Sequence, residues 1–134
     1  MVDFLADSAA ALAEMVQAGK VSSRELVQHA LDRIDAADRA VNAFVAVDGD
    51  RALDDAHVID ERVARGEDVG PLAGLPLGVK DLEDAIGFRT TKGSLLHAER
   101  AIATSDSELV SRLSVTLVAD QPAVVVSKSA VSRL

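Results

Sequence analysis

The spacing of apolar and polar residues along the chain predicts several amphipathic helices. Ser8 can cap a first helix, in which Leu12 and Val16 fall on one apolar stripe and which ends at Gly19. Ser22 and Glu25 have the spacing of a capping box in front of a second stripe. The expected helices therefore cover residues 9–18, residues 22 to about 37, and residues 50–66, and a further capping box formed by Ser105 and Glu108 predicts a fourth helix.

Short apolar runs between these helices predict strands. The first run lies before the turn pair Asp48-Gly49, and another follows Pro122, a residue suited to the start of a strand. A polar stretch with Gly70 and Pro71 predicts a surface loop over residues 67–74. The expected strands are residues 43–47, 76–80 and 123–126. Helices that alternate with short strands indicate an α/β fold, with helices around an incomplete mixed sheet.

Composition removes several classes of function. The net charge is −8, so a nucleic-acid backbone is not an expected partner. Because cysteine is absent, disulfides, thiolate metal sites and cysteine nucleophiles are excluded. The three histidines are far apart in the sequence, and neither a metal site nor a cofactor is expected. The acidic N-terminus does not resemble a targeting signal and no apolar run is long enough for a membrane helix, so we expect a cytoplasmic protein with no membrane partner.

The most informative stretch is residues 71–94, which reads PLAGLPLGVKDLEDAIGFRTTKGS. With the segments VSSREL and NAF before it, this stretch resembles the amidase signature family of serine hydrolases. The resemblance covers residues 8–113 of one expected domain, residues 1–134, whereas the tail at residues 114–134 departs from the family pattern. It rests on Gly74, Pro76, Gly78, Val79, Lys80 and Asp81, and then on Gly87, Thr90, Thr91, Gly93 and Ser94.

The resemblance implies a catalytic role for Lys80, as the base of a Ser-Ser-Lys triad. A lysine that accepts a proton must be neutral, which requires removal from water. Asp81 would oppose this, but successive strand residues point to opposite faces, so its charge can be directed away. The alternative is a surface lysine whose stem covers apolar side chains while its ammonium stays in water.

Both triad serines of the family lie downstream of this strand, in a Gly/Ser-rich segment and a later loop that residues 1–134 do not contain. We therefore expect a truncated chain that is inactive alone and only marginally stable. The intact family implies a small-molecule amide substrate. Two alternative functions stay open. One is a fragment resembling the A subunit of a glutamine-dependent amidotransferase. The other is a non-catalytic interaction module that binds a partner chain through its helical N-terminus, at the face with Leu26 and Leu31, or through an exposed sheet edge. The expected partners are a second copy of the chain or the other amidotransferase subunits.

Overall fold

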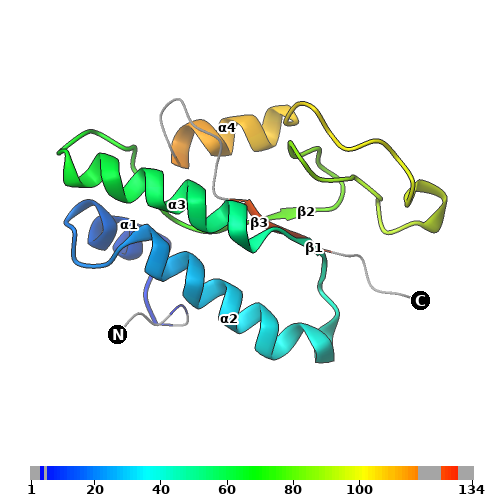
Figure 1. The fold of residues 1–134 in the computed structure, drawn as a ribbon, viewed down its shortest axis with the longest axis horizontal. Helices are drawn as coiled ribbons and strands as arrows, with labels where there is room; N and C mark the ends of the chain where they lie inside the picture. The colour runs from blue at the N-terminus through cyan, green and yellow to red at the C-terminus, as the bar shows by residue number, and fades with distance from the viewer. Residues whose placement is uncertain (1–3, 5, 118–124, 130–134) are drawn as a thin grey trace.

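The computed structural model of the protein describes residues 4, 6–117 and 125–129, where helices alternate with short strands (Figure 1). This arrangement confirms the expected α/β fold. The helices are α1 (Ala9–Gln17), α2 (Ser23–Val41), α3 (Gly49–Ala64) and α4 (Glu108–Leu117), with a short 3-10 helix, η1 (Leu95–His97). The strands are β1 (Phe44–Val47), β2 (Leu77–Lys80) and β3 (Val125–Ser129).

Serine caps begin the first two helices, as the sequence predicts. At α1 the Ser8 hydroxyl accepts a hydrogen bond from the Ala11 N–H at 3.1 Å. At α2 the capping box is complete, because the Glu25 N–H donates to Ser22 Oγ at 3.0 Å and the Ser22 N–H donates to Glu25 Oε2 at 2.8 Å. The bond from the Ser22 N–H lowers the pKa of Glu25.

Helix α2 is longer than its apolar stripe predicts. It continues past residue 37 to Val41, and Asn42 then adopts a left-handed conformation with φ 50°. The Asp38 carboxylate accepts the N–H groups of Ala43 and Phe44 at 2.7 and 3.0 Å. This carboxylate joins the last turn of α2 to the start of β1, an interaction that an apolar pattern does not register.

Strand β3, the last of the described strands, is the central strand of the sheet. Strand β3 pairs antiparallel with β1 and parallel with β2, which confirms the expected mixed sheet. The prediction of this strand over residues 123–126 is wrong at its C-terminal end, since the strand continues to Ser129; residues 123 and 124 lie outside the described residues. Backbone pairing extends the strand because Ser129 aligns with both Phe44 and Lys80, whatever the polarity of its side chain.

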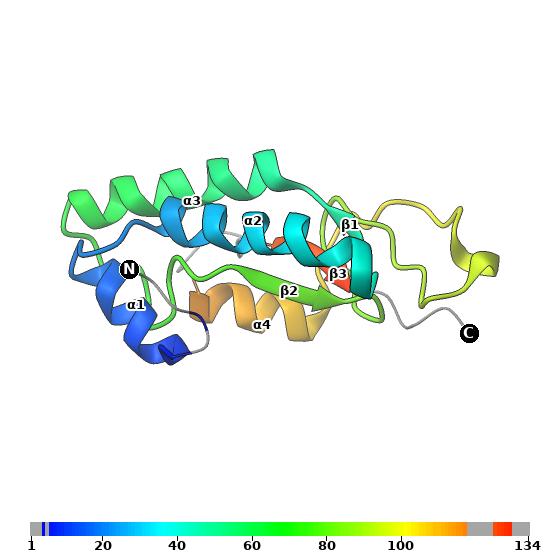
Figure 2. The same ribbon diagram turned by 90° about the horizontal axis from the view of Figure 1, so that it is seen from below.

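The helices lie on both sides of the sheet. Figure 2 shows α2 and α3 together on one side of the strands and α4 on the other. Buried side chains from these layers form one core, which includes Ile59 of α3, Val79 of β2 and Val110 of α4. Leu26 of α2 is also in the core with 0% exposure, so the idea that Leu26 binds a partner is wrong.

The N-terminus of α4 is capped by a different serine from the one that the sequence predicts. The Ser105–Glu108 capping box is not formed, because α4 begins at Glu108 and the Val110 N–H donates to Ser107 Oγ at 3.4 Å. The same Ser107 hydroxyl donates to Glu83 Oε2 at 2.6 Å. The capping hydroxyl thus also binds a residue distant in the sequence, a contact that a local capping pattern does not register.

Candidate active site around Lys80

Lys80 is the last residue of β2, and its backbone is held on both sides. In the sheet it is aligned with Ser129 of β3. Beyond the strand, its carbonyl oxygen accepts the N–H groups of Leu82 at 2.7 Å and Glu83 at 3.0 Å, which forms a tight turn. The side chain is exposed. The strand thus directs an amine to the surface from a fixed backbone position, although it does not remove that amine from water.

Asp81 lies on the opposite face from Lys80. Its side chain is 1% exposed, and Val79 on the other side of Lys80 is 5% exposed. The alternation of buried and exposed residues is that of an extended strand. The buried Asp81 side chain and the exposed Lys80 side chain therefore point in opposite directions, as the sequence predicts.

The segment between β2 and α4 is cross-linked by polar side chains near Asp81. Thr90 is 4% exposed, and its hydroxyl donates to Asp84 Oδ1 at 2.5 Å and to the Glu83 carbonyl at 3.3 Å. The Ser107 N–H donates to the Asp84 carbonyl at 2.8 Å. These bonds join both ends of the segment. Sequence reasoning did not assign these contacts, and the only sequence signal for them is the Thr90-Thr91 pair of the family motif.

Helix α3 anchors the same segment through Arg51. Arg51 Nη1 donates a hydrogen bond to the Ile86 carbonyl at 2.7 Å, and Arg51 Nε lies 3.7 Å from Asp55 Oδ2. Burial raises the pKa of Asp55, while the charge of Arg51 acts in the opposite direction. Gly87 has φ +87°, and a Cβ placed there would lie 2.5 Å from Arg51 Nη1. The motif glycine therefore makes room for the arginine.

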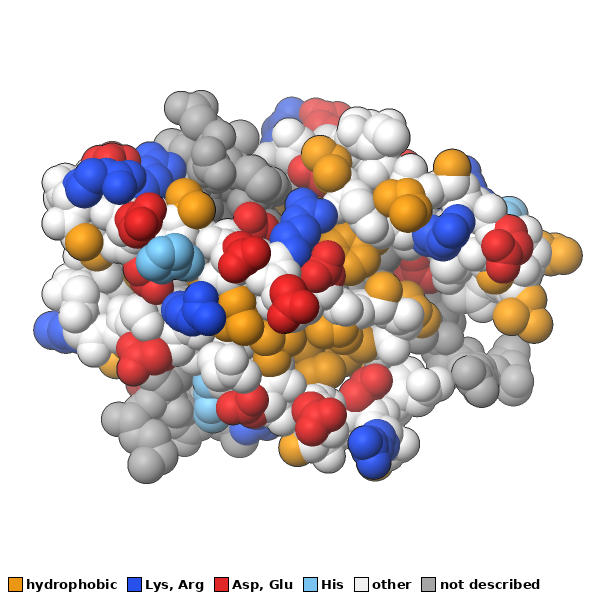
Figure 3. Space-filling model, in the orientation of Figure 1, with side chains coloured by type: hydrophobic (Ala, Val, Ile, Leu, Met, Phe, Trp, Pro, Cys, Tyr) orange, Lys and Arg blue, Asp and Glu red, His pale blue; other side chains and the backbone are white. Residues whose placement is uncertain are grey.

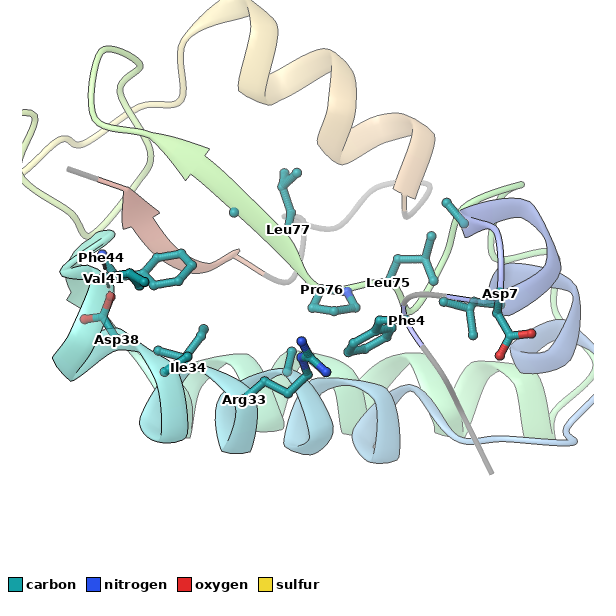
Figure 4. Close-up of a pocket in the computed structure, with 15 residues that line it drawn as sticks. Phe4, Asp7, Arg33, Ile34, Asp38, Val41, Phe44, Leu75, Pro76 and Leu77 are labelled. Atoms are coloured by element: carbon teal, nitrogen blue, oxygen red, sulfur yellow. Dashed lines mark hydrogen bonds between the residues drawn. The ribbon is translucent and has the colours of Figure 1, made fainter. Parts of the chain in front are cut away.

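A groove of about 510 Å³ lies between α2 and the segment that enters β2 (Figure 4). Figure 4 shows Ile34 and Phe44 on one side and Pro76 and Leu77 on the other. Its lining is mainly apolar, and Lys80 does not contribute to it. The groove reaches β2 at Leu77 and Gly78, before the strand arrives at Lys80.

The histidines hold no metal site in the described part of the chain, where no group of three or more metal-binding side chains is found. His57 Nε2 lies 3.6 Å from Glu61 Oε1. The two residues are one turn apart on α3, and both are more than half exposed. Such a surface contact gives no support for a ligand or base role.

Apolar side chains also reach the surface. Val45 and Val47 of the edge strand β1 are 46% and 45% exposed, and Leu95 in η1 is 93% exposed. Figure 3 shows hydrophobic side chains gathered near the middle of one face, with acidic side chains around them. Across residues 4, 6–117 and 125–129, no helix is long and apolar enough to span a bilayer.

Comparisons with known proteins match this fold and motif. The profile of the family described as Amidase matches residues 25–129. The A subunit of the Salinispora tropica glutamyl-tRNA(Gln) amidotransferase is 46% identical over 113 residues, which are 84% of this chain and 23% of that protein. The corresponding subunit of the Acidothermus cellulolyticus enzyme is 43% identical, with 84% of this chain and 22% of that protein covered.

Solved structures give the same result. The native peptide amidase of Stenotrophomonas maltophilia has a TM-score of 0.80 and 33% identity, covering 94% of this chain and 25% of that one. A chain of an inhibitor-bound vestigial protein complex, described as revealing the origins of an s-triazine catabolic enzyme, also has a TM-score of 0.80, with 37% identity and 90% and 25% coverage. This chain spans about a quarter of the length of these relatives. Because the family profile covers most of its residues, the chain belongs to the amidase signature family.

Proposed function

We propose that this chain supplies the lysine-bearing part of a hydrolase that cleaves carboxamide C–N bonds, with Lys80 as the base of a Ser-Ser-Lys triad. The observation that supports this role is the position of Lys80 at the end of β2, exposed and on the opposite face from Asp81. An ordinary surface lysine would need neither the fixed backbone turn behind it nor the separation from its neighbouring carboxylate.

The proposed chemistry is acyl transfer through a serine. A neutral Lys80 amine takes the proton of a bridging serine, which in turn takes the proton of the nucleophilic serine. The nucleophilic oxygen then bonds to the amide carbonyl carbon. The C–N bond breaks, and the leaving nitrogen departs with the proton that the Lys80 ammonium returns through the bridging serine. Water finally hydrolyses the acyl-enzyme.

Two requirements of this chemistry lie outside the 134 residues. The sequence contains no Gly/Ser-rich segment that would supply the serines. The exposed side chain of Lys80 also has to be covered before its amine can lose water. We therefore propose that further amidase-type chain completes the site, and that residues 1–134 alone are catalytically inactive. Reading the DNA downstream of this segment in all frames, in search of the Gly/Ser-rich motif, tests the first part of this proposal.

A chimeric enzyme tests the role of Lys80. The matching quarter of the Stenotrophomonas maltophilia peptide amidase is replaced by this chain, and hydrolysis of a peptide amide is measured. Lys80→Ala should lower kcat by at least about 10²-fold, the usual contribution of a general base. Lys20→Ala, which changes another exposed lysine, outside residues 71–94, is the matched control. Equal activity of the chimeras with and without the Lys80→Ala substitution would contradict the proposal.

A second candidate function is that of a fragment of an amidotransferase A subunit. It is favoured by the 46% identity to the Salinispora tropica protein, which exceeds the 33% identity to the peptide amidase. On this hypothesis the partners are the other amidotransferase subunits, and the chain should co-purify with them in a fixed ratio. A stand-alone amidase predicts no such partner. A non-catalytic interaction module predicts a stoichiometric partner whose binding does not depend on Lys80.

A further inference from the structure

Asp81 carries a buried carboxylate whose place in the structure the triad chemistry leaves unexplained. A buried carboxylate is costly unless hydrogen bonds replace its water. Here the Thr91 N–H donates to Asp81 Oδ1 at 2.8 Å, and the Gly93 N–H donates to Oδ2 at 3.2 Å. The Thr91 hydroxyl also donates to Oδ2. All of these donors come from one short stretch that lies about ten residues further along the chain.

The backbone of Asp81 binds the same stretch. Its carbonyl oxygen accepts the Lys92 N–H at 3.0 Å. The N–H groups of three consecutive residues, 91, 92 and 93, are therefore all directed to Asp81. The carboxylate and the carbonyl of one residue thus both bind a single turn.

This turn has a conformation that its sequence does not favour. Lys92 has φ 55° and Gly93 has φ 66°, and the Ser94 N–H donates to the Thr91 carbonyl at 3.0 Å. Positive φ at both central residues is the type I′ geometry, which favours glycine or asparagine at the position of Lys92. A lysine with a left-handed backbone persists only where its surroundings hold it there. The contacts with Asp81 supply that restraint.

The turn and the candidate base are thus connected through one residue. Lys80 precedes Asp81 directly, and its carbonyl is itself fixed by the Leu82 and Glu83 N–H groups. A shift of Asp81 would move the end of β2 and the turn at residues 91–94 together. The position of the Lys80 side chain depends on this arrangement, because its direction is set by the extended backbone at the end of the strand.

We propose that Asp81 is a positioning residue, which fixes the Lys80 side chain and the turn at residues 91–94 relative to one another. The inference rests on the proposed function of Lys80 and adds to it a second residue that never contacts the substrate.

The test uses the 134-residue chain and two NMR measurements. Amide hydrogen exchange is followed at residues 91–93, and the dimethylamine signals of the reductively methylated lysines are compared between variants. Asp81→Ala should increase exchange at Thr91 and Gly93 by at least about tenfold, as expected for local opening, and should shift or broaden the Lys80 signal. The Lys20 signal should stay unchanged, since Lys20 is distant from this turn in the sequence and shares no hydrogen bond with it.

Asp106→Asn is the matched control, because its carboxylate also accepts a backbone N–H in the same segment, that of Ile86 at 2.8 Å. It should increase exchange at Ile86 and leave both residues 91–93 and the Lys80 signal unchanged. Where Asp81→Ala does not fold, Asp81→Asn keeps the shape of the side chain and serves in its place. Lys92→Gly should restore at least half of the protection that Asp81→Asn loses, since glycine needs no restraint at positive φ.

Two results would overturn the proposal. Faster exchange at Thr91 and Gly93 with an unchanged Lys80 signal would leave Asp81 a structural role in the turn alone. Unchanged exchange would remove the restraint itself. Neither result depends on catalysis by Lys80, which the chimeric enzyme tests separately, so failure of the positioning role and failure of the proposed function are distinguishable.

Discussion

The replacement Gly74→Ala should strongly destabilise the fold. Gly74 precedes β2 and has φ +82°, and a Cβ there would lie 2.9 Å from Val16 Cγ1 and 3.0 Å from Ser23 Cβ. Neither neighbour can move easily. Val16 is 1% exposed, and Ser23 is held by hydrogen bonds from its hydroxyl to the Gly74 carbonyl at 3.0 Å and from its N–H to Asp60 Oδ1 at 2.6 Å.

The magnitude follows from two contributions. A residue with a Cβ at positive φ costs about 1 kcal/mol or somewhat more. Overpacking a well-filled core adds about 1–3 kcal/mol. Gly74→Ala should therefore lower the free energy of unfolding by about 2–4 kcal/mol, a large part of the roughly 5–15 kcal/mol typical of a domain. Gly66→Ala separates the two contributions, because Gly66 has φ +73° with nothing within 4 Å of the added Cβ, and it should cost only about 1 kcal/mol.

Urea unfolding followed by far-UV circular dichroism measures both variants, since the chain has neither Trp nor Tyr for fluorescence. The expected result is a lower midpoint for Gly74→Ala than for Gly66→Ala, with unchanged urea dependence. Equal losses for the two variants, within about 0.5 kcal/mol, would refute the reasoning that steric contact at Val16 and Ser23 sets the cost.

Four further outcomes are expected. The purified chain should hydrolyse no simple amide above background, and Lys80→Ala should not differ from it; turnover that is lost in Lys80→Ala would show a nucleophile within these residues. Ser107→Ala should cost about 1 kcal/mol in urea unfolding and Ser105→Ala almost nothing, whereas the reverse order would restore Ser105 as the cap. The pKa of Asp55 in the folded chain is raised above its usual value of 3.8, so the stability that this carboxyl contributes is present below that pH and is lost as the pH rises through the raised pKa. The urea midpoint should fall over this pH range, and Asp55→Asn should make the fall less steep. An equally steep fall in the variant would contradict this reasoning. Sedimentation velocity should show self-association through apolar surface such as Val45 and Val47, and a stable monomer would argue against it.

The local features of the fold are readable from the sequence. Ser8 and the pair Ser22 and Glu25 mark helix starts because each cap binds backbone only three residues away. Long-range caps are not readable in this way. The Asp60 carboxylate of α3 accepts the N–H groups of Ser23 and Arg24 at 2.6 and 3.1 Å, so it caps α2 from a different helix.

The same difference between local and long-range contacts applies to the candidate site. The opposite orientations of Lys80 and Asp81 follow from strand periodicity alone. The partners of Asp81 do not, because Thr91 and Gly93 reach it only after the chain has turned back. Gly93 is a sequence signal for a tight turn. The positive φ of Lys92 is not predictable in the same way, because lysine does not favour that backbone conformation.

The place of β3 in the sheet has a consequence for folding during synthesis. In the described sheet, strands β1 and β2 do not pair with each other; each pairs with β3, which follows both of them in the sequence. The N-terminal helices can form and pack as soon as they emerge, whereas the sheet must wait for a strand that closes a long loop back to Phe44. Until then the two early strands leave unpaired backbone groups open to other chains, so chaperone binding and aggregation during translation should concentrate in this interval.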